Sequence, residues 1–401
     1  MTNHNDSILV NAPGFLDPTF GLEGIVYVPG PGRISGIVED ADGAMIYCVW
    51  ADKDIWLYRS FADGTPDLEF GEGGRTRWSF ALGVSSMPVE LLLQEDGKIV
   101  LIGATQALDD IFKLQLAVTR FNQNGSPDLI FGNKIFLPPE QAVSVSNLPY
   151  GCLQKDGKIL LGVSYADKDS VRSGRIYRLH SNGANDLEFG AERGWIDVQF
   201  NGSSTMVECV GVTKNDEILI GATSDSRQQL VGRFTSPGII DPSFGINGWW
   251  VAEGVNILGN FVLHGEQIVV VGAEIDEGTY QACISRLTAD GEFDPQFNKG
   301  KRLLVSVPVD TAQYPVTMEY VALQSDGKIV AAGHAGYVNQ SFWLRVQNDG
   351  VLDPLFGDQG LHVHTPSSFH GGLLVQRNGQ RIIAALDPAS AVDSHILGIQ
   401  S

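Results

Sequence analysis

Two histidines at alternate positions are the most specific candidate for chemistry in this sequence. His362 and His364 flank one valine in an apolar run, and side chains two residues apart on a β-strand project to the same side. Two imidazoles so placed would bind zinc or copper once a third ligand approached. His370, in the following loop, is the candidate third ligand. Histidines at this spacing also occur as pore-lining or surface residues, so a metal site and an ordinary polar role are both open.

Carboxylates form a second group of candidates, because they stand in pairs within short segments between apolar runs. Such pairs would suit calcium, but none has the alternating Asp-x-Asp-x-Asp-Gly order of an EF-hand loop. They form either a partner-binding surface or a set of solvated charges without a target. The members of this group are Asp52, Asp54, Asp109, Asp110, Asp167, Asp169, Asp276 and Glu277.

Other motifs that carry chemistry are absent from the sequence. It contains no Gly-x-Ser-x-Gly elbow, no His-Glu-x-x-His and no phosphate-binding Gly-Lys-Ser/Thr loop. The formal net charge of −20 repels phosphate backbones and anionic lipids, which argues against nucleic-acid binding. No apolar run approaches the roughly 18 residues that span a bilayer. We therefore expect no catalytic residues, no cofactor, no nucleic acid and no membrane insertion.

The elements that must position these candidates are indicated by an internal repeat. An Asp-x-x-Phe-Gly pattern recurs at intervals of 50 to 61 residues, with Asn298 in place of the glycine in one copy. A glycine always stands three residues before the aspartate, and an arginine stands eight residues before it in six copies. The aspartates are Asp17, Asp67, Asp128, Asp186, Asp241, Asp294 and Asp353. The arginines are Arg59, Arg120, Arg178, Arg233, Arg286 and Arg345.

A second marker between these copies predicts a β-hairpin. Asp96-Gly97, Asp156-Gly157 and Asp326-Gly327 each precede Lys-Ile and an aliphatic residue, and Asp-Gly between apolar runs is a strong hairpin signal because both turn positions favour positive φ. In the unit that contains Asp96, we expect strands over 76–82, 89–94, 98–104 and 116–122. Helical periodicity is missing throughout.

These features predict an all-β fold, a single closed seven-bladed β-propeller of four-stranded antiparallel blades over residues 1–401. An open solenoid is the competing architecture, but the terminal units lack the polar capping character that a solenoid needs. The predicted blades span 24–63, 74–124, 135–182, 194–237, 248–290, 300–349 and 360–401. Residues 1–16 form a closing segment. We expect residues 394–400 to form the last strand of the ring, with the N-terminal segment pairing alongside.

The repeated residues resemble the delta-60 repeat family of β-propellers. Its pattern is similar to Leu-x-x-Gln-x-Asp-Gly-Lys-Ile-Val followed by Arg-x-x-x-x-Gly-x-x-Asp-x-x-Phe-Gly, and it spans essentially the full chain. The resemblance implies a fold and no activity. We interpret the recurring Asp, Arg, Phe and Gly as structural: they hold the linker between units, so function is expected where the units differ, on loops.

Strand parity places those loops on one face of the disc. The connections between the first and second strands of each unit, and between the third and fourth, share a side that we call the variable face. The eight carboxylates named above belong to this face, which is our predicted partner-binding face. The tight hairpins and the Asp-x-x-Phe linkers share the other side, which we call the hairpin face.

The leading functional hypothesis is a non-enzymatic binding or scaffold propeller that recognises a protein partner through the variable face. One alternative is a carbohydrate-binding, lectin-like propeller that uses some of the seven scattered tryptophans. A further alternative is an enzyme centred in the channel, metal-assisted near His362 and His364. The fold does not separate these hypotheses, because propellers host all three.

Two further expectations concern the state of the protein. The first residues carry neither the basic nor the apolar region of a signal peptide, which predicts a cytoplasmic protein, with export by another route left open. The four widely spaced cysteines are expected to be free and packed in strands. We also expect a monomer.

Overall fold

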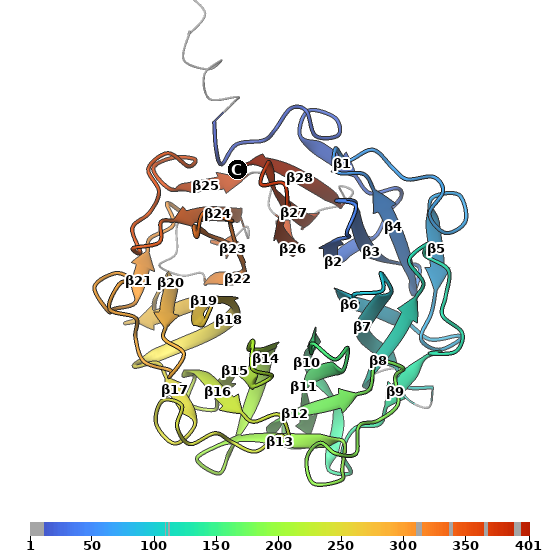
Figure 1. The fold of residues 1–401 in the computed structure, drawn as a ribbon, viewed down its shortest axis with the longest axis horizontal. Helices are drawn as coiled ribbons and strands as arrows, with labels where there is room; N and C mark the ends of the chain where they lie inside the picture. Colours follow the sequence, from blue (N-terminus) through green and yellow to red (C-terminus); the bar gives the residue numbers. More distant parts are fainter. Residues whose placement is uncertain are drawn as a thin grey trace, which may run out of the picture.

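The computed structural model describes every residue except 1–11, 109, 111–112, 310–314, 337–339, 365–367 and 389–393. The described residues form 28 strands and no helix. The strands are arranged as seven antiparallel blades around a central channel, which confirms the predicted seven-bladed propeller (Figure 1). In the described part of the chain, no helix is long and apolar enough to cross a membrane.

In each blade four strands lie side by side, in order from the channel to the rim. The innermost strands are β2 (Arg33–Glu39), β6 (Ser86–Leu93), β10 (Ala142–Leu153), β14 (Ser203–Val212), β18 (Val255–His264), β22 (Val316–Leu323) and β26 (Ser368–Val375). The second strands are β3 (Met45–Ala51), β7 (Ile99–Gln106), β11 (Ile159–Asp167), β15 (Ile218–Ser224), β19 (Gln267–Asp276), β23 (Ile329–Ala335) and β27 (Arg381–Pro388). The third strands are β4 (Asp54–Ser60), β8 (Leu114–Phe121), β12 (Arg172–Leu179), β16 (Gln229–Phe234), β20 (Thr279–Leu287), β24 (Gln340–Val346) and β28 (His395–Gln400). The outermost strands are β5 (Arg75–Trp78), β9 (Lys134–Phe136), β13 (Trp195–Phe200), β17 (Trp249–Val251), β21 (Leu303–Val305), β25 (Leu361–His364) and β1 (Ile25–Tyr27).

The sheet pairing groups the strands differently from the predicted units. Each predicted unit began with the strand after the Asp-x-x-Phe linker, but β5 pairs with β4, at Leu57 and Thr76, as the outermost strand of the preceding blade. The linker therefore turns the chain back within one blade, and the segment after β5 crosses to the next. A sequence repeat does not show with which neighbouring strand each strand pairs. The predicted repeat unit and the observed blade are therefore offset by one strand.

Ring closure joins the two ends of the described chain. β28 forms the third strand of the last blade, and β1 completes that blade by pairing with it, at Val26 and Ile396. The segment before β1 runs alongside the same strand: the Gly14 amide donates to the Gln400 carbonyl at 2.9 Å, and Leu16 bridges Ile399. The predicted pairing of the N-terminal segment is seen for these residues, while residues 1–11 lie outside the described part.

The recurring Arg, Asp and Phe hold each linker in place, as interpreted from the sequence. Arg178 pairs with Asp186 at 2.7 Å, and its guanidinium lies over the Phe189 ring at 4.6 Å. Phe189 is fully buried, and its ring packs against Gly238 of the following linker, where a Cβ would approach within 2.6 Å. Equivalent pairs occur in all seven blades, with nitrogen–oxygen distances of 2.6 to 2.9 Å.

Hairpin geometry corrects the expected turn type. In the β6–β7 turn, Gly97 has a φ of +78° while Asp96 has negative φ, so one turn residue and not two adopts the left-handed conformation. The Gln94 amide bonds the Lys98 carbonyl at 2.9 Å, and Asp96 accepts from the Lys98 amide at 3.2 Å. This pattern is a three-residue turn with glycine at the bulge position.

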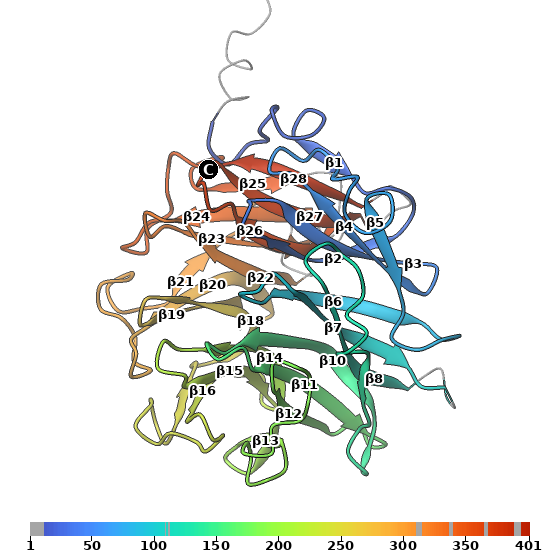
Figure 2. The same cartoon turned by 45° about the vertical axis from the view of Figure 1, so that its right-hand side comes forward.

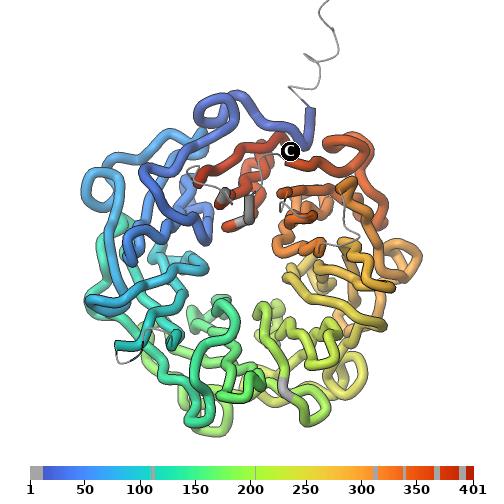
Figure 3. Tube along the Cα trace, turned by 180° about the vertical axis from the view of Figure 1, so that it is seen from behind, coloured from blue at the N-terminus to red at the C-terminus, as the bar shows by residue number. Residues whose placement is uncertain are grey.

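Packing between neighbouring blades forms the core. The buried residues fall into seven apolar clusters, each formed largely by two neighbouring blades. The four cysteines are free, as predicted, and three of them are fully buried. Figures 2 and 3 show the ring of blades turned by 45° and from behind.

Candidate functional site

The predicted partner-binding carboxylates lie on one face, but several are committed to local contacts. Asp54 accepts a hydrogen bond from Arg77 Nε at 2.7 Å. Asp167 accepts the backbone amides of Asp169 and Val171, at 2.8 and 2.9 Å, and so holds its own turn. These contacts give Asp54 and Asp167 a structural role that requires no binding partner.

Other members of the group carry charge that is free of ion pairs. Asp52, Asp276 and Glu277 are exposed, and among the described residues none has a cationic side chain within salt-bridge distance. All three lie in tight turns between second and third strands, where Asp52 and Glu277 adopt positive φ. They are the predicted carboxylates that remain available to a partner.

Asp110 and Asp169 add little free charge to that surface, because each forms an ion pair. Asp110 pairs with Lys113 at 3.8 Å, and Asp169 pairs with Lys168 at 3.2 Å, both on the exterior. Asp109 lies outside the described residues. The seven described members of the group share a face but do not converge on one point, because they belong to loops of four different blades.

Exposed apolar side chains on the variable face were not among the predicted residues. Leu82, Leu108 and Leu137 expose 88%, 78% and 74% of their surface, and Val171 exposes 52%. They lie in four loops that follow one another along the chain, between β5 and β12. Exposed leucines also occur in the linkers, where Leu68, Leu129 and Leu187 each follow the recurring aspartate directly; those of the variable face occupy no repeated position. Apolar residues beside charged loops are typical of protein-docking surfaces.

The histidine candidates lie at the rim and not at the channel. His362 and His364 are in β25, the outermost strand of its blade, so the pore-lining alternative does not apply to them. Both rings pack on Trp343, with centroid distances of 4.8 and 5.5 Å, and burial lowers the pKa of His362.

His370, the third proposed metal ligand, does not share a strand or a blade with His362 and His364. The backbone of His370 belongs to β26, an innermost strand, and its side chain lies outside the described residues. Within the described part of the chain, no three His, Cys, Asp or Glu side chains are grouped as a metal site.

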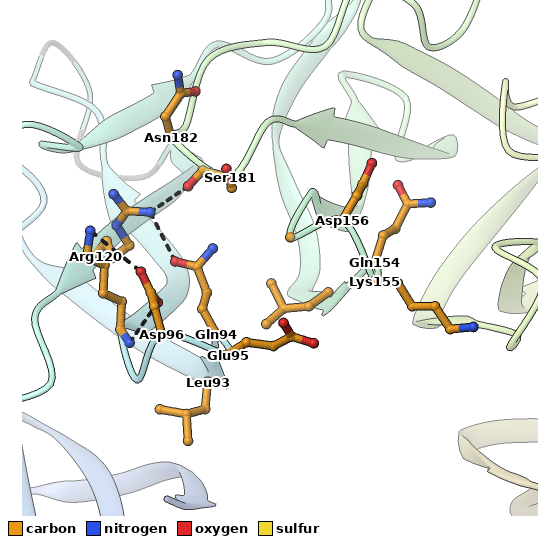
Figure 4. A pocket seen from close by; sticks show the side chains of 13 residues that line it. Leu93, Gln94, Glu95, Asp96, Arg120, Gln154, Lys155, Asp156, Ser181 and Asn182 are labelled. Carbon is orange, nitrogen blue, oxygen red and sulfur yellow. Dashed lines mark hydrogen bonds and ion pairs between the residues drawn. The ribbon is translucent and has the colours of Figure 1, made fainter. Parts of the chain in front are cut away.

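A groove of about 590 Å³ lies on the hairpin face (Figure 4). It lies between the β6–β7 and β10–β11 hairpins, where Arg120 donates to Gln94 Oε1 at 3.0 Å and to the Ser181 carbonyl at 2.5 Å. Similar grooves beside Arg59 and Arg233 occupy the corresponding places between other blades. Because the groove repeats with the fold, it is a by-product of blade packing.

The channel combines a backbone irregularity found in every blade with side chains that differ from blade to blade. Every innermost strand is interrupted by a register shift against its neighbour, at about the same level of the channel. Bulges of this kind redirect side chains and occur often beside functional sites. Polar residues occupy this level in several blades, and we call this set the channel belt: Glu90, Tyr150, Glu208, Asn260, Glu319 and Tyr320.

Belt residues share one environment across the channel. Burial raises the pKa of Glu90 to about 8, although the Gly151 amide donates to its Oε2 at 2.6 Å. Burial likewise raises the pKa of Glu208 to about 7, against a hydrogen bond from Asn147. After burial itself, Tyr320 and the three belt glutamates raise the pKa of Tyr150. Side chains from four innermost strands are therefore close enough to influence one another electrostatically.

Sequence reasoning missed the belt because its members follow no shared motif. Position is common to them, not residue type: Glu90, Tyr150, Asn260 and Tyr320 are each the first paired residue after the bulge of their strand. A signal was available in the charges, since Glu90, Glu208 and Glu319 each interrupt a largely apolar run.

Sequence comparison supports the propeller architecture. Residues 154–189, 267–297 and 324–356 match the family described as "Domain of unknown function (DUF5122) beta-propeller". The match is to a propeller family with no assigned activity. Each segment begins near a β-hairpin and ends at or beside the linker phenylalanine, so it covers the markers identified from the sequence. The delta-60 resemblance agrees with this family in fold, and no curated protein shows significant sequence similarity to the chain.

Solved structures with the same fold have diverse roles. The WD40 repeats of RRP9 superpose with a TM-score of 0.55 at 13% identity, covering 98% of this chain and 99% of that one. A catalytically inactive virginiamycin B lyase from Staphylococcus aureus, with quinupristin, has a TM-score of 0.51 at 11% identity, covering 94% and 98%. Likeness at this level of identity shows the fold alone.

Proposed function

We propose that the protein is a non-enzymatic binding propeller that recognises a basic protein partner through its variable face. The observation that carries the proposal is a set of exposed apolar side chains, Leu82, Leu108 and Leu137, in loops of a face that also bears exposed carboxylates. The seven recurring aspartates of the hairpin face are each paired with an arginine. On the variable face Asp52, Asp276 and Glu277 are exposed, and the described residues include no ion-pair partner for them.

Charge and shape favour a protein as the partner. The formal net charge of −20 would accelerate encounter with a basic surface. Exposed Leu82, Leu108 and Leu137 supply apolar area on the same face, and an interface needs such area because rim charges alone contribute little affinity. The carbohydrate and enzyme alternatives lack an equivalent observation on this face.

The test compares charge reversal on the two faces. A variable-face variant, Asp52→Lys with Asp276→Lys and Glu277→Lys, is matched by a hairpin-face variant, Glu69→Lys with Glu95→Lys and Glu188→Lys. Both change the net charge equally, and all six residues are exposed. Partners captured from host extract by the native protein are identified, and each is purified and titrated against the three proteins.

We expect the variable-face variant to lose at least tenfold in affinity and the hairpin-face variant to lose much less. Equal losses would indicate a non-specific effect of net charge, and a larger loss on the hairpin face would overturn the proposal. A glycan array screened with the native protein tests the lectin alternative directly.

A further inference from the structure

Four residues of the channel belt line a space that opens on the variable face. A cavity of about 500 Å³ is lined by innermost strands of six blades, and its lining includes Glu90, Tyr150, Asn260 and Tyr320. Its mouth is formed by Arg33 and Trp50, at the ends of β2 and β3 that face the variable side, and by Asp387. A cavity of this size accommodates a small organic molecule.

The far side of the belt is apolar. Val38, Leu91, Val321 and Leu373 line the cavity on the hairpin side of the belt. They keep the carboxyl of Glu90 away from bulk water on that side, which is the physical reason that its charged form is disfavoured. The belt is thus a polar layer between the charged mouth of the cavity and its apolar base.

Positive charge is scarce in this space. Among the described residues that line the cavity, Arg33 alone is cationic, and it stands at the mouth with its Nε 3.5 Å from Asp387. No Lys or Arg occurs in the other six innermost strands, whereas Glu90, Glu208 and Glu319 all stand at bulges. Among the described residues, Glu90 and Glu208 accept hydrogen bonds but have no ion pair, whereas Glu319 Oε2 lies 3.6 Å from Nδ1 of His334.

Aromatic side chains also lie at this wall. Trp50 lines the cavity together with Tyr150 and Tyr320. Aromatic side chains and carboxyls in one cavity suit a cation with an apolar stem: ring faces attract cations, and a carboxylate forms its strongest hydrogen bonds with charged donors.

We propose that the channel cavity binds an organic cation, an alkylammonium or alkylguanidinium group, with Glu90 as its counter-ion and Tyr150 and Tyr320 beside it. The inference stands on the cavity and does not require that a protein docks on the variable face. The cation comes either from a free amine or from a Lys or Arg side chain of a partner, and the two sources share this chemistry.

Other ligand classes fit less well. A phosphate or carboxylate ligand would meet Glu90, Asp387 and one arginine that is already paired with Asp387. A metal ion would need closely grouped ligands, which the described residues do not provide. A neutral ligand would gain hydrogen bonds but would leave Glu90 without a counter-ion, so a neutral analogue serves as the comparison ligand in the test.

Calorimetry with an isosteric pair of probes tests the proposal. Butylguanidinium and butylurea have nearly the same shape and differ in charge. We expect the native protein to bind butylguanidinium at least tenfold more tightly than butylurea at pH 7. Binding should release about one proton per cation, because the protonated Glu90 ionises against it. Titration in two buffers of different ionisation enthalpy measures that release.

Substitution locates the site. Glu90→Gln keeps an acceptor for the Gly151 amide and removes the charge, so it should fold while losing roughly 10- to 100-fold in affinity for butylguanidinium. Its proton release should also disappear. Glu95→Gln is the matched control, because Glu95 is exposed in the β6–β7 turn, on the hairpin face. Tyr320→Phe should weaken binding without abolishing the proton release.

The outcomes are distinct. Equal binding of the two probes, absence of binding by both the probe and a Lys- and Arg-rich peptide, or unchanged affinity in Glu90→Gln would overturn the proposal. Glu90-dependent binding of butylguanidinium alone indicates a free cation as ligand. Glu90-dependent binding of the peptide alone indicates a partner side chain. Failure of the variable-face charge reversal to affect a protein partner leaves these results unchanged.

Discussion

Arg381 binds Asp17 although 364 positions of sequence separate them, with Nε 2.6 Å from Oδ2. In the other six blades the corresponding arginine is on the third strand, but here Ile399 takes that place in β28 and the arginine comes from β27. The same guanidinium donates to Thr19 Oγ1 at 2.8 Å. An arginine on the adjacent strand thus supplies the missing repeat residue, and the pair fastens the first described linker to the last blade.

Breaking this pair should weaken the closed ring. Arg381→Gln leaves Asp17 largely buried without a counter-ion, and we expect a loss of about 2 to 4 kcal/mol in the free energy of unfolding. The control is Arg77→Gln, which breaks the exposed pair with Asp54 and should cost less than about 1 kcal/mol. Urea unfolding measures both, and similar losses would show that the seventh pair contributes nothing special to closure.

The linker phenylalanines should contribute far more stability than the leucines beside them. Phe131 is 1% exposed and Leu129 is 77% exposed in the same linker. Phe131→Ala should destabilise the protein by about 3 to 5 kcal/mol, because it opens a cavity between two blades. Leu129→Ala should change stability by less than about 0.5 kcal/mol. Thermal and urea unfolding of the two variants check this, and a small effect at Phe131 would contradict the structural role assigned to the repeat.

Glu90 should make the protein less stable at alkaline pH. Its pKa in the folded protein is raised to about 8 from an ordinary value of 4.5, so folding takes up a proton between these two values. Stability from this group is complete below pH 4.5 and declines as the pH rises through 8. At pH 9 Glu90→Gln should be more stable than the native protein by about 1 to 3 kcal/mol, allowing for water in the channel. Urea unfolding at pH 5 and 9 measures the difference, and a gain that is equal at both would exclude this cause.

His362 should have the opposite pH dependence. Burial against Trp343 and Phe15 lowers its pKa below 6.5, so the unfolded chain takes up a proton first as the pH falls. Stability from the neutral ring is present above pH 6.5 and is lost as the pH falls below that value. His362→Phe keeps the aromatic packing and removes the titration. We expect the native protein to lose up to about 1 kcal/mol more than the variant between pH 7 and 5. Parallel losses in the two proteins would show that the ring is protonated without cost.

Local features of the chain were sufficient to predict the strands and their number. The expected strands over 89–94 and 98–104 correspond to β6 (Ser86–Leu93) and β7 (Ile99–Gln106). Short strands and tight turns depend on neighbouring residues, and seven copies of one pattern imply seven blades. Asn298 shows how local this information is: it replaces the linker glycine and adopts a φ of +45°, a conformation that asparagine tolerates.

Pairings between distant segments were decided by the tertiary structure. The sequence did not indicate that β5 belongs to the blade before its own repeat, that Arg381 would reach Asp17, or that His362 would lie at the rim. Each depends on which segment lies beside another after the ring has closed, and a one-dimensional repeat carries no such information.

The channel belt shows the same limit most clearly. Glu90, Tyr150 and Tyr320 come from three blades and belong to no shared motif. A bulge in each innermost strand brings them to one level, and the ring closure brings them to one cavity. The sequence was enough to specify a seven-bladed framework, because that framework is built from repeated local contacts. The cavity exists only in the closed ring, because its walls are residues that meet nowhere else.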